Sequence, residues 1–373
     1  MANLNSSDLR RINKRAVLRL AIERGHISKP EIASELSLSL PTVGQLTSEL
    51  MEEGFLQASG TQESRGGRRA QRLQPIKNAR YAVGIEFTKQ HIMFIAINLA
   101  GEIVASERVR KAFEDDPDFY ALVVSRRKEF TAKAQIPEEK ILGVGVSVQG
   151  IISPDQKFFQ SHMLGKRHLT PLHPYENDIP YYFLNDGTAS CLPECYAKDN
   201  PKDFIYLMLS RTVGGSVVYD RTLQEGMNLH SGEFGHMILH PERPDMCYCG
   251  CKGHVWCYTS VDMLEDFCRD SYQTFFRRLE DGEKEYVLKF DAYLNDLAML
   301  VTNLRAAYDM TIIIGGYLSG SLTPYLPYLK AKVAELDHLY ADSRADILLS
   351  RHGAEAAALG AALHFTEEFL NGL

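Results

Sequence analysis

Cysteine and histidine residues gather in one stretch of the chain at a spacing that suits a metal ion. Four of the seven cysteines fall between residues 247 and 257. Zinc takes four tetrahedral ligands from cysteine and histidine, and two cysteines one residue apart can converge with a nearby histidine where the backbone turns at a glycine. We therefore predict a structural zinc ion held by His236, Cys247, Cys249 and His254. Cys251 and Cys257 are alternative ligands, and a reduced, metal-free cysteine cluster is the alternative to a metal site.

A second set of chemical groups, short polar side chains on one helical stretch, predicts contact with DNA. These side chains lie on the outward face of the helix expected after Ser39, and they are Thr42, Gln45, Ser48 and Glu49. A glutamine can bond an adenine edge in the major groove at two points, so we expect Gln45 to read a base. Thr42 and Ser48 are expected to lie beside it on the DNA.

A basic loop rich in glycine follows that helix. Residues 64–69 read Ser-Arg-Gly-Gly-Arg-Arg, which is typical of the wing of a β-hairpin. Glycines let the backbone approach a narrow groove, and arginines are attracted to phosphates and to the negative potential of the minor groove. We therefore expect Arg65, Arg68 and Arg69 to bind DNA.

Three helices would position these groups. Apolar residues between 13 and 24 suit a buried helix that Gly25 can end. Ser28 and Glu31 form a capping box for the second helix, and Ser39 is a good N-cap for the third, which Gly54 closes. Two short helices joined by a tight turn predict a helix-turn-helix. The alternative is a three-helix packing unit with a solvated basic loop.

The distribution of charge favours DNA binding over that alternative. The chain carries a net charge of −7, yet residues 1–80 hold 13 basic and 8 acidic side chains, so the remainder is strongly acidic. A basic module at one end of an acidic chain is typical of a nucleic-acid-binding domain. With 45% hydrophobic residues and no apolar run near the roughly 20 residues of a membrane span, we expect a folded cytoplasmic protein without a membrane partner.

The rest of the chain predicts two mixed sheets. Segments 81–87, 91–98 and 102–108 read as three antiparallel strands. Further short apolar strands are expected at 141–148, 181–184, 204–209 and 311–314, with helical stretches such as 294–308 between them. This alternation in two halves fits an α/β fold of two lobes around a cleft.

Together these motifs resemble the ROK family, which groups sugar-responsive repressors and sugar kinases on an actin-like fold. The most specific similarity is Gly-Glu-Phe-Gly-His at 232–236 followed by Cys-Tyr-Cys-Gly-Cys-Lys-Gly-His at 247–254, and the glycine- and alanine-rich segment 353–361 extends it. His254 replaces the family's third cysteine and can still bind zinc. The resemblance implies an N-terminal winged helix-turn-helix followed by a two-lobed, ribonuclease H-like ROK domain of the sugar kinase type.

The same resemblance implies the position of a sugar site. Its residues would be Asn185, Asp186, Glu233 and His236. Ionised carboxylates fix the orientation of sugar hydroxyls through charge-assisted hydrogen bonds. Trp256 stands where the family usually places another acidic sugar ligand, and its indole could stack on a sugar ring. Without the resemblance, residues 185–187 would read as a simple turn.

A kinase of this family would use Asp186 as a general base and would hold ATP phosphates in glycine-rich turns. Residues 86–90 contain no glycine, and residues 210–212 replace the family's second glycine-bearing turn. Side chains there would crowd the phosphates. We therefore expect no enzymatic activity, with a ROK-type sugar kinase carrying a DNA-binding domain as the alternative.

The resulting interpretation is a transcriptional regulator of carbohydrate metabolism genes, most simply a repressor. Its partners would be a double-stranded DNA operator and a small sugar effector, and a homodimer or homotetramer would match paired half-sites. A further alternative is an effector that is another protein or a sugar phosphate. We expect domain boundaries at 1–78 for the winged helix, 79–190 for the first lobe and 191–373 for the second, with the final helix returning to the first lobe.

Overall fold

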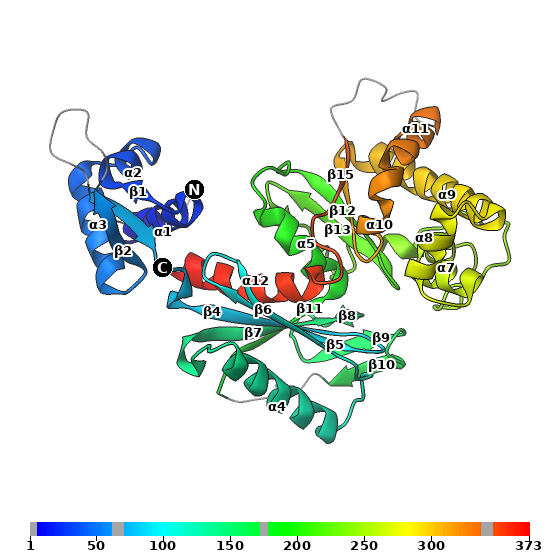
Figure 1. Cartoon of the computed structure of the whole chain (residues 1–373), viewed down its shortest axis with the longest axis horizontal. Coiled ribbons are helices and arrows are strands. Elements are labelled where there is room, and N and C mark those ends of the chain that lie inside the picture. The colour runs from blue at the N-terminus through cyan, green and yellow to red at the C-terminus, as the bar shows by residue number, and fades with distance from the viewer. Residues whose placement is uncertain (1–5, 62–70, 172–177, 337–345) are drawn as a thin grey trace.

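The computed structural model describes residues 6–61, 71–171, 178–336 and 346–373. A winged-helix unit lies at one end of the molecule and two α/β lobes form the rest (Figure 1). The predicted wing arginines Arg65, Arg68 and Arg69 fall outside the described residues. Among the described residues, no helix is long and apolar enough to cross a bilayer.

The N-terminal helices begin where their capping residues predict. They are α1 (Ser6–Arg24), α2 (Lys29–Glu35) and α3 (Leu40–Glu52). The backbone N–H of Ser28 donates to the Glu31 carboxylate at 2.7 Å, and the Ser28 hydroxyl accepts in return from the Glu31 N–H. Ser39 caps α3 by accepting from the N–H of Thr42. Both caps satisfy N–H groups that a helix start leaves unbonded.

Three short strands complete the winged helix. They are β1 (Ile27–Ser28), β2 (Leu56–Thr61) and β3 (Gln71–Pro75), in the antiparallel order β1-β3-β2. Leu73 of β3 packs with Val17, Ile32 and Leu50 in one apolar core. The predicted helix-turn-helix is thus confirmed, and the three helices and the sheet share one core.

The first lobe is a five-stranded sheet with a helix on each face. Its strands are β4 (Tyr81–Phe87), β5 (Ile92–Asn98), β6 (Ile103–Val109), β7 (Ile141–Val148) and β11 (Tyr181–Asn185), in the order β11-β7-β4-β5-β6. Helix α4 (Pro117–Lys133) covers one face and α12 (Ala356–Gly372) the other (Figure 1). Short 3-10 turns, η1 (Lys77–Ala79) and η2 (Glu138–Lys140), lead into β4 and β7.

Glycines on the sheet let α12 approach the strands closely. A Cβ on Gly84 would lie 1.8 Å from the Ala358 carbonyl oxygen, and one on Gly145 would lie 1.9 Å from that of Ala361. No side chain fits at such distances, so these strand positions require glycine. The alanine-rich helix consequently rests directly on the backbone of the sheet.

A small sheet that the sequence did not predict extends from the first lobe. It contains β8 (Ile151–Ile152), β9 (Phe158–Ser161) and β10 (Lys166–Pro171), in the antiparallel order β10-β9-β8. Because β8 follows directly after β7, this sheet stands at the carboxyl end of the central strands. It places residues 149–163 next to the space between the lobes.

The second lobe repeats the mixed-sheet plan. Its strands are β12 (Phe204–Leu209), β13 (Val213–Tyr219), β14 (Thr222–Leu223), β15 (Thr311–Gly315) and β16 (Ile347–Leu349), in the order β14-β13-β12-β15-β16. The helices are α5 (Asp186–Tyr196), α6 (Trp256–Thr259), α7 (Val261–Cys268), α8 (Tyr272–Glu280), α9 (Lys284–Tyr308), α10 (Ser319–Leu322) and α11 (Leu326–Leu336), with 3-10 turns η3 (Phe234–His236) and η4 (Thr323–Tyr325). The boundary expected between residues 190 and 191 falls inside α5, which runs unbroken across it.

Helix α12 connects the winged helix to the lobes. Its residues 356–363 pack on the first lobe and on α5, whereas Leu370 joins the core of the winged helix. Arg19 of α1 pairs with Glu367 at 3.2 Å, and the rings of Phe55 and Phe369 meet edge to face at 5.4 Å. One helix therefore contacts both the DNA-binding unit and the lobes.

Candidate functional site

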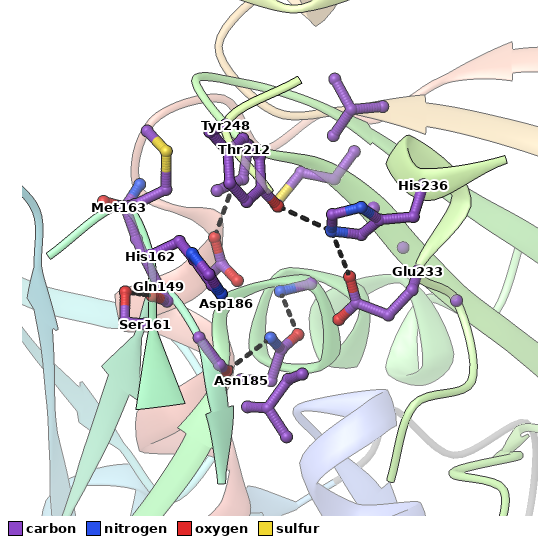
Figure 2. A pocket seen from close by; sticks show the side chains of 18 of the residues that line it. Gln149, Ser161, His162, Met163, Asn185, Asp186, Thr212, Glu233, His236 and Tyr248 are labelled. Carbon is purple, nitrogen blue, oxygen red and sulfur yellow. Dashed lines mark hydrogen bonds and ion pairs between the residues drawn. The ribbon is translucent and has the colours of Figure 1, made fainter. Parts of the chain in front are cut away.

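A cavity opens between the lobes at the start of α5 (Figure 2). Strands β7 and β11 of the first lobe end at it, and β13 and η3 of the second lobe face it. The polar residues that line it include Gln149, Ser161, His162, Asn185, Asp186, Thr212, Glu233, His236 and Tyr248. Four of the five predicted sugar-site residues line this cavity. Thr212 and Tyr248, which the sequence analysis did not assign to the sugar site, add two hydroxyl groups.

Asn185 is both a lining residue and the N-cap of α5. Its side-chain oxygen accepts from the backbone N–H groups of Gly187 at 2.8 Å and Thr188 at 3.2 Å. Its amide nitrogen donates to the carbonyl oxygen of Gly150 at 2.8 Å, in the segment between β7 and β8. Asn185 thus ties the start of α5 to the small sheet and fixes one edge of the cavity.

Asp186 places a buried carboxylate in the cavity. Its side chain is 5% exposed and accepts a hydrogen bond from the Thr212 hydroxyl at 2.8 Å. Burial raises the pKa of Asp186 to about 6, although the bonds from Thr212 and the Gly187 N–H lower it. The carboxylate can therefore accept from a ligand hydroxyl at neutral pH without a cation beside it.

Glu233 and His236 face each other across η3. The Glu233 carboxylate lies 3.9 Å from Nε2 of His236, and the Tyr248 hydroxyl lies 2.9 Å from the same nitrogen (Figure 2). Burial raises the pKa of Glu233 to about 7, and the charge of Asp186 adds to that shift. These groups form a dense set of hydrogen-bonding partners on the second-lobe side of the cavity.

The four preferred metal ligands come together beside the cavity. Donor atoms of His236, Cys247, Cys249 and His254 all lie within 4.8 Å of one another. Sγ of Cys249 is 3.5 Å from Nδ1 of His254. Because Nε2 of His236 faces Glu233 and Tyr248, Nδ1 is the ring nitrogen that remains for a metal. Two thiols and two imidazoles are a donor set that zinc accepts, so the side chains fit the expected ion.

The two alternative cysteines do not belong to this group. Cys251 is exposed, and Sγ of Cys257 is directed at the carbonyl oxygen of Asp245 at 3.7 Å. A glycine turn explains the convergence of the others, since Gly250 adopts a φ of 90° directly after Cys249. The spacing that the sequence showed is therefore sufficient to bring four donors to one point.

Trp256 does not line the cavity. Its indole N–H donates to the carbonyl oxygen of Arg211 at 2.7 Å, and its ring meets Tyr248 edge to face at 5.2 Å. A partly buried indole favours an acceptor for its N–H, and the backbone of the 210–212 segment supplies one. Trp256 is thus directed at the 210–212 backbone and at Tyr248, and the stacking of its indole on a sugar stays a prediction.

The segments where a kinase would hold phosphates are occupied by internal hydrogen bonds. The Thr88 hydroxyl accepts from the N–H of His91 at 3.1 Å and donates to the carbonyl oxygen of the same residue at 3.0 Å. Arg211 forms two ion pairs at 2.6 Å, with Asp262 and Glu265. Neither turn presents free backbone N–H groups on a glycine loop of the kind that cradles phosphates.

A buried carboxyl lies at the end of β4, next to this turn. Glu86 is 5% exposed, and its Oε2 has no hydrogen-bond partner among the described residues. Burial raises its pKa to about 8, the charge of Asp186 adds to the shift, and Arg108 opposes it. An acidic group in this position would repel a nucleotide's phosphates when ionised.

The outward face of α3 carries the residues expected to read DNA. Gln45 and Ser48 are exposed and Thr42 is half-buried. The Thr42 hydroxyl bonds that of Ser39 at 2.8 Å, and Ser48 donates to the Gly44 carbonyl oxygen at 2.9 Å. Glu49, by contrast, pairs with Arg10 of α1. Gln45 thus presents a long, exposed polar side chain on this face.

The fold and the cavity define a winged-helix protein with a two-lobed α/β domain of the sugar-kinase type. The chain belongs to the ROK family, whose model matches residues 82–368. Residues 10–57 match a second model, described as winged helix-turn-helix DNA-binding. The expected family and fold class are therefore confirmed.

Similar curated proteins include named repressors. A xylose repressor of Caldicellulosiruptor bescii is 30% identical over 272 residues, which cover 71% of this chain and 66% of that protein. The chain thus spans just under two thirds of that relative. A xylose repressor of Bacillus subtilis is 24% identical over 97% of both chains. A DNA-binding transcriptional dual regulator of Escherichia coli, NagC, is 24% identical over 67% of this chain and 63% of its own.

Solved structures show the same fold. A ROK family transcriptional regulator, described as a homologue of the E. coli Mlc protein, has a TM-score of 0.78 at 20% identity over 98% of both chains. A ROK family glucokinase from Streptomyces griseus, crystallised with glucose and AMPPNP, has a TM-score of 0.66 at 18% identity and covers 76% of this chain and 98% of its own. The regulator therefore aligns with almost the whole of this chain, whereas the glucokinase aligns with about three quarters of it.

Proposed function

We propose that this protein is a transcriptional regulator, a repressor, that binds operator DNA through its winged helix and a sugar in the cavity between its lobes. The observation that carries the proposal is the combination of an exposed Gln45 on α3 with a polar cavity built around Asp186 and Glu233. The names of the similar repressors agree with it. The regulated genes would serve carbohydrate metabolism.

The sugar would bind through groups that both lobes supply. Asp186 and Glu233 would accept hydrogen bonds from hydroxyl groups, because a carboxylate accepts more strongly than a neutral oxygen. Asn185 and His236 would hold neighbouring hydroxyls, and Tyr248 would offer its ring face. Since Asn185 lies at the junction of the lobes and Glu233 lies on the second lobe, a sugar held by both would favour one relative position of the lobes.

A zinc ion would fix the second-lobe side of this cavity. His236, Cys247, Cys249 and His254 would be its four ligands and would leave no open position. Zinc would supply a rigid crosslink and no chemistry on the sugar. By holding His236 at one ring nitrogen, it would orient the other nitrogen toward Glu233 and Tyr248.

Coupling between sugar and DNA would use α12. This helix packs on α5, whose first residues line the cavity, and on α1 of the winged helix. Allosteric coupling requires the ligand to bind one state better than another, and α12 packs against a helix next to each site. Two copies of the chain, as a homodimer or as half of a homotetramer, would read paired half-sites.

The sugar kinase is the weaker candidate. Phosphoryl transfer depends on positioning and charge stabilisation of the phosphates. The Thr88 turn is closed on His91, and Arg211 is neutralised by two acids. A steady turnover of ATP by the pure protein with any sugar would nevertheless refute the regulator hypothesis in its present form.

The DNA-binding part can be tested by selecting tight duplexes from a random library and comparing variants on them. Gln45→Ala is expected to weaken binding to the selected duplex by about 1–3 kcal/mol, because a two-point contact to an adenine is lost. Gln273→Ala, on the exposed face of α8, is the matched control and should leave affinity unchanged. Selection that yields no sequence preference would contradict operator recognition, and full affinity of Gln45→Ala would exclude base reading by this residue.

A further inference from the structure

A second cavity adjoins the proposed sugar site. It measures about 210 Å³, compared with about 70 Å³ for the first, and Asn185 lines both. Elsewhere the two cavities are lined by neighbouring residues of the same segments. The first cavity is lined by Gly187, Gly215 and Gly232, and the second by their chain neighbours Thr188, Ser216 and Ser231. The two spaces are therefore adjoining compartments between the small sheet and the second lobe.

The partition between the compartments is thin. It consists of the Asn185 side chain, bonded to the Gly150 carbonyl oxygen, and of backbone at two glycines. A Cβ on Gly232 would lie 2.0 Å from the carbonyl oxygen of Gly215, so these segments pack backbone to backbone. The φ of Gly232 is 87°, which also favours glycine. Bare backbone and one amide therefore separate the cavities.

The second cavity has the composition of a carbohydrate site. Its lining combines polar groups of Gln224, Glu225 and Ser231 with the apolar side chains of Ile152 and Leu223. Sugar rings present hydroxyl edges and C–H faces, and mixed surfaces of this kind bind both. Among the described residues that line it, Glu225 is the one charged side chain, so an anionic group such as a phosphate would find no cation here.

We propose that the second cavity is a subsite for a second sugar unit, so that the effector is a neutral disaccharide or a longer neutral glycoside. This inference rests on the proposed function, because it takes the first cavity as the site of the first sugar unit. One ring would lie against Asp186 and Glu233, and the glycosidic link would cross beside Asn185. The second ring would then contact the 224–231 segment.

Calorimetry on the full chain tests the proposal with matched sugars. The probes are glucose, xylose, galactose, fructose and N-acetylglucosamine, and the disaccharides cellobiose, maltose, lactose, sucrose, xylobiose and chitobiose. At least one disaccharide is expected to bind about tenfold more tightly than its constituent monosaccharides, which corresponds to about 1.4 kcal/mol. Monosaccharide binding without such a gain would overturn the subsite and leave the proposed function standing. No binding by any sugar would overturn both.

Two variants locate the extra affinity. Ser231→Trp fills the second cavity and is expected to lower the affinity for the disaccharide about tenfold. The affinity for the monosaccharide should stay within about twofold of the wild-type value. Met227→Trp is the matched control, because Met227 is 95% exposed on the same segment and does not line the cavity. Equal weakening of both kinds of sugar by Ser231→Trp, or of neither, would refute a separate subsite.

A milder substitution covers the case in which Ser231→Trp fails to fold. Glu225→Ala removes an exposed side chain and should preserve the melting temperature. It is expected to lower the affinity for the disaccharide about fivefold, because one hydrogen bond is lost, and to leave the affinity for the monosaccharide unchanged. An unchanged disaccharide affinity in this variant would count against the subsite.

Discussion

The two sides of the cleft between the lobes differ in how their polar groups are used. On the side of the proposed sugar site, Asp186 and Glu233 line the cavity and keep acceptor capacity for a ligand. On the side where a kinase would hold phosphates, Thr88 is bonded to His91, and Arg211 is paired with two acids. One fold thus retains a recognition surface on one side while the other side is closed by its own side chains.

This difference shows that a binding site and a catalytic site can be separated within one cleft. Sugar recognition needs a few well-placed acceptors, which Asn185 and Asp186 would provide at a helix start. Phosphate transfer needs backbone N–H groups on glycine loops, and side chains replace them here. Loss of the second set leaves the first intact, because the two sets lie on different segments.

The largest effect is expected from removing the metal ligands on the sugar side. The double variant Cys247→Ser/Cys249→Ser should lose bound zinc and bind sugar about 100-fold more weakly, because His236 would no longer be held. Zinc content by mass spectrometry and sugar affinity by calorimetry measure the two effects. Cys251→Ser is the control and should retain both. Full zinc content in the double variant would exclude the proposed ligand set.

The next effect concerns the buried carboxylate of the sugar site. Asp186→Asn keeps the shape of the side chain and its bond to Thr212 but removes the charge. We expect sugar affinity to fall by about 1.5–3 kcal/mol, the range for hydrogen bonds to charged groups. Asp220→Asn, in an exposed turn after β13, should have no effect. If Asp186→Asn bound sugar normally, the carboxylate would have no place in the site.

A pH-dependent effect is expected on the phosphate side. The pKa of Glu86 is raised to about 8 in the folded protein, so the fold binds its proton more tightly than the unfolded chain does. The stability from this group is full below the ordinary carboxyl pKa and is lost as pH rises through about 8. Between pH 6 and pH 8, the wild type should therefore lose about 1–2 kcal/mol more unfolding free energy than Glu86→Gln.

Urea denaturation at the two pH values measures that difference. Glu285→Gln, an exposed position in the first turn of α9, is the control and should follow the wild type. Parallel pH profiles for the wild type and Glu86→Gln would show that Glu86 is paired or hydrated in solution. The contrast between the two sides of the cleft would then be smaller than the structure indicates.

The smallest effect is expected from nucleotide. Millimolar MgATP, with or without sugar, should move the melting temperature by less than about 1 °C, because a ligand that does not bind the native state does not stabilise it. A bound sugar should raise the melting temperature in the same assay and serves as the positive control. A shift of several degrees with MgATP would mean that the Thr88 turn opens and that the phosphate side still functions.

Local patterns in the sequence predicted the parts of the molecule that depend on neighbouring residues. The capping box at Ser28, the N-cap at Ser39 and the strand at 81–87 are found as expected. The four metal-ligand side chains also converge, since Cys247, Cys249 and His254 lie within one short turn. Such features require few long-range contacts, so spacing alone predicts them.

Features that depend on distant segments were not predicted. The small sheet that brings Gln149 and His162 to the cavity forms from strands too short and too weakly patterned to recognise. β13 was missed because Gly214 and Gly215 read as a loop. The hydrogen bond of the Trp256 indole to the carbonyl oxygen of Arg211 was not predicted, because Arg211 is distant in sequence. Tyr248 was not predicted for a different reason, because its position between Cys247 and Cys249 is typical of a metal-binding turn and not of a cavity wall.

The position of α12 has a consequence for how the chain acquires its structure during synthesis. The ribosome completes β4, β5 and β7 long before it makes residues 356–372, yet the face of the sheet bearing Ala82 and Ile95 is covered by that helix. Until then the nascent first lobe exposes an apolar surface, which is a hazard for aggregation. A shortened product that stops before α12 is therefore expected to be degraded or insoluble. The winged helix and the first lobe would both lose the packing contacts that α12 provides.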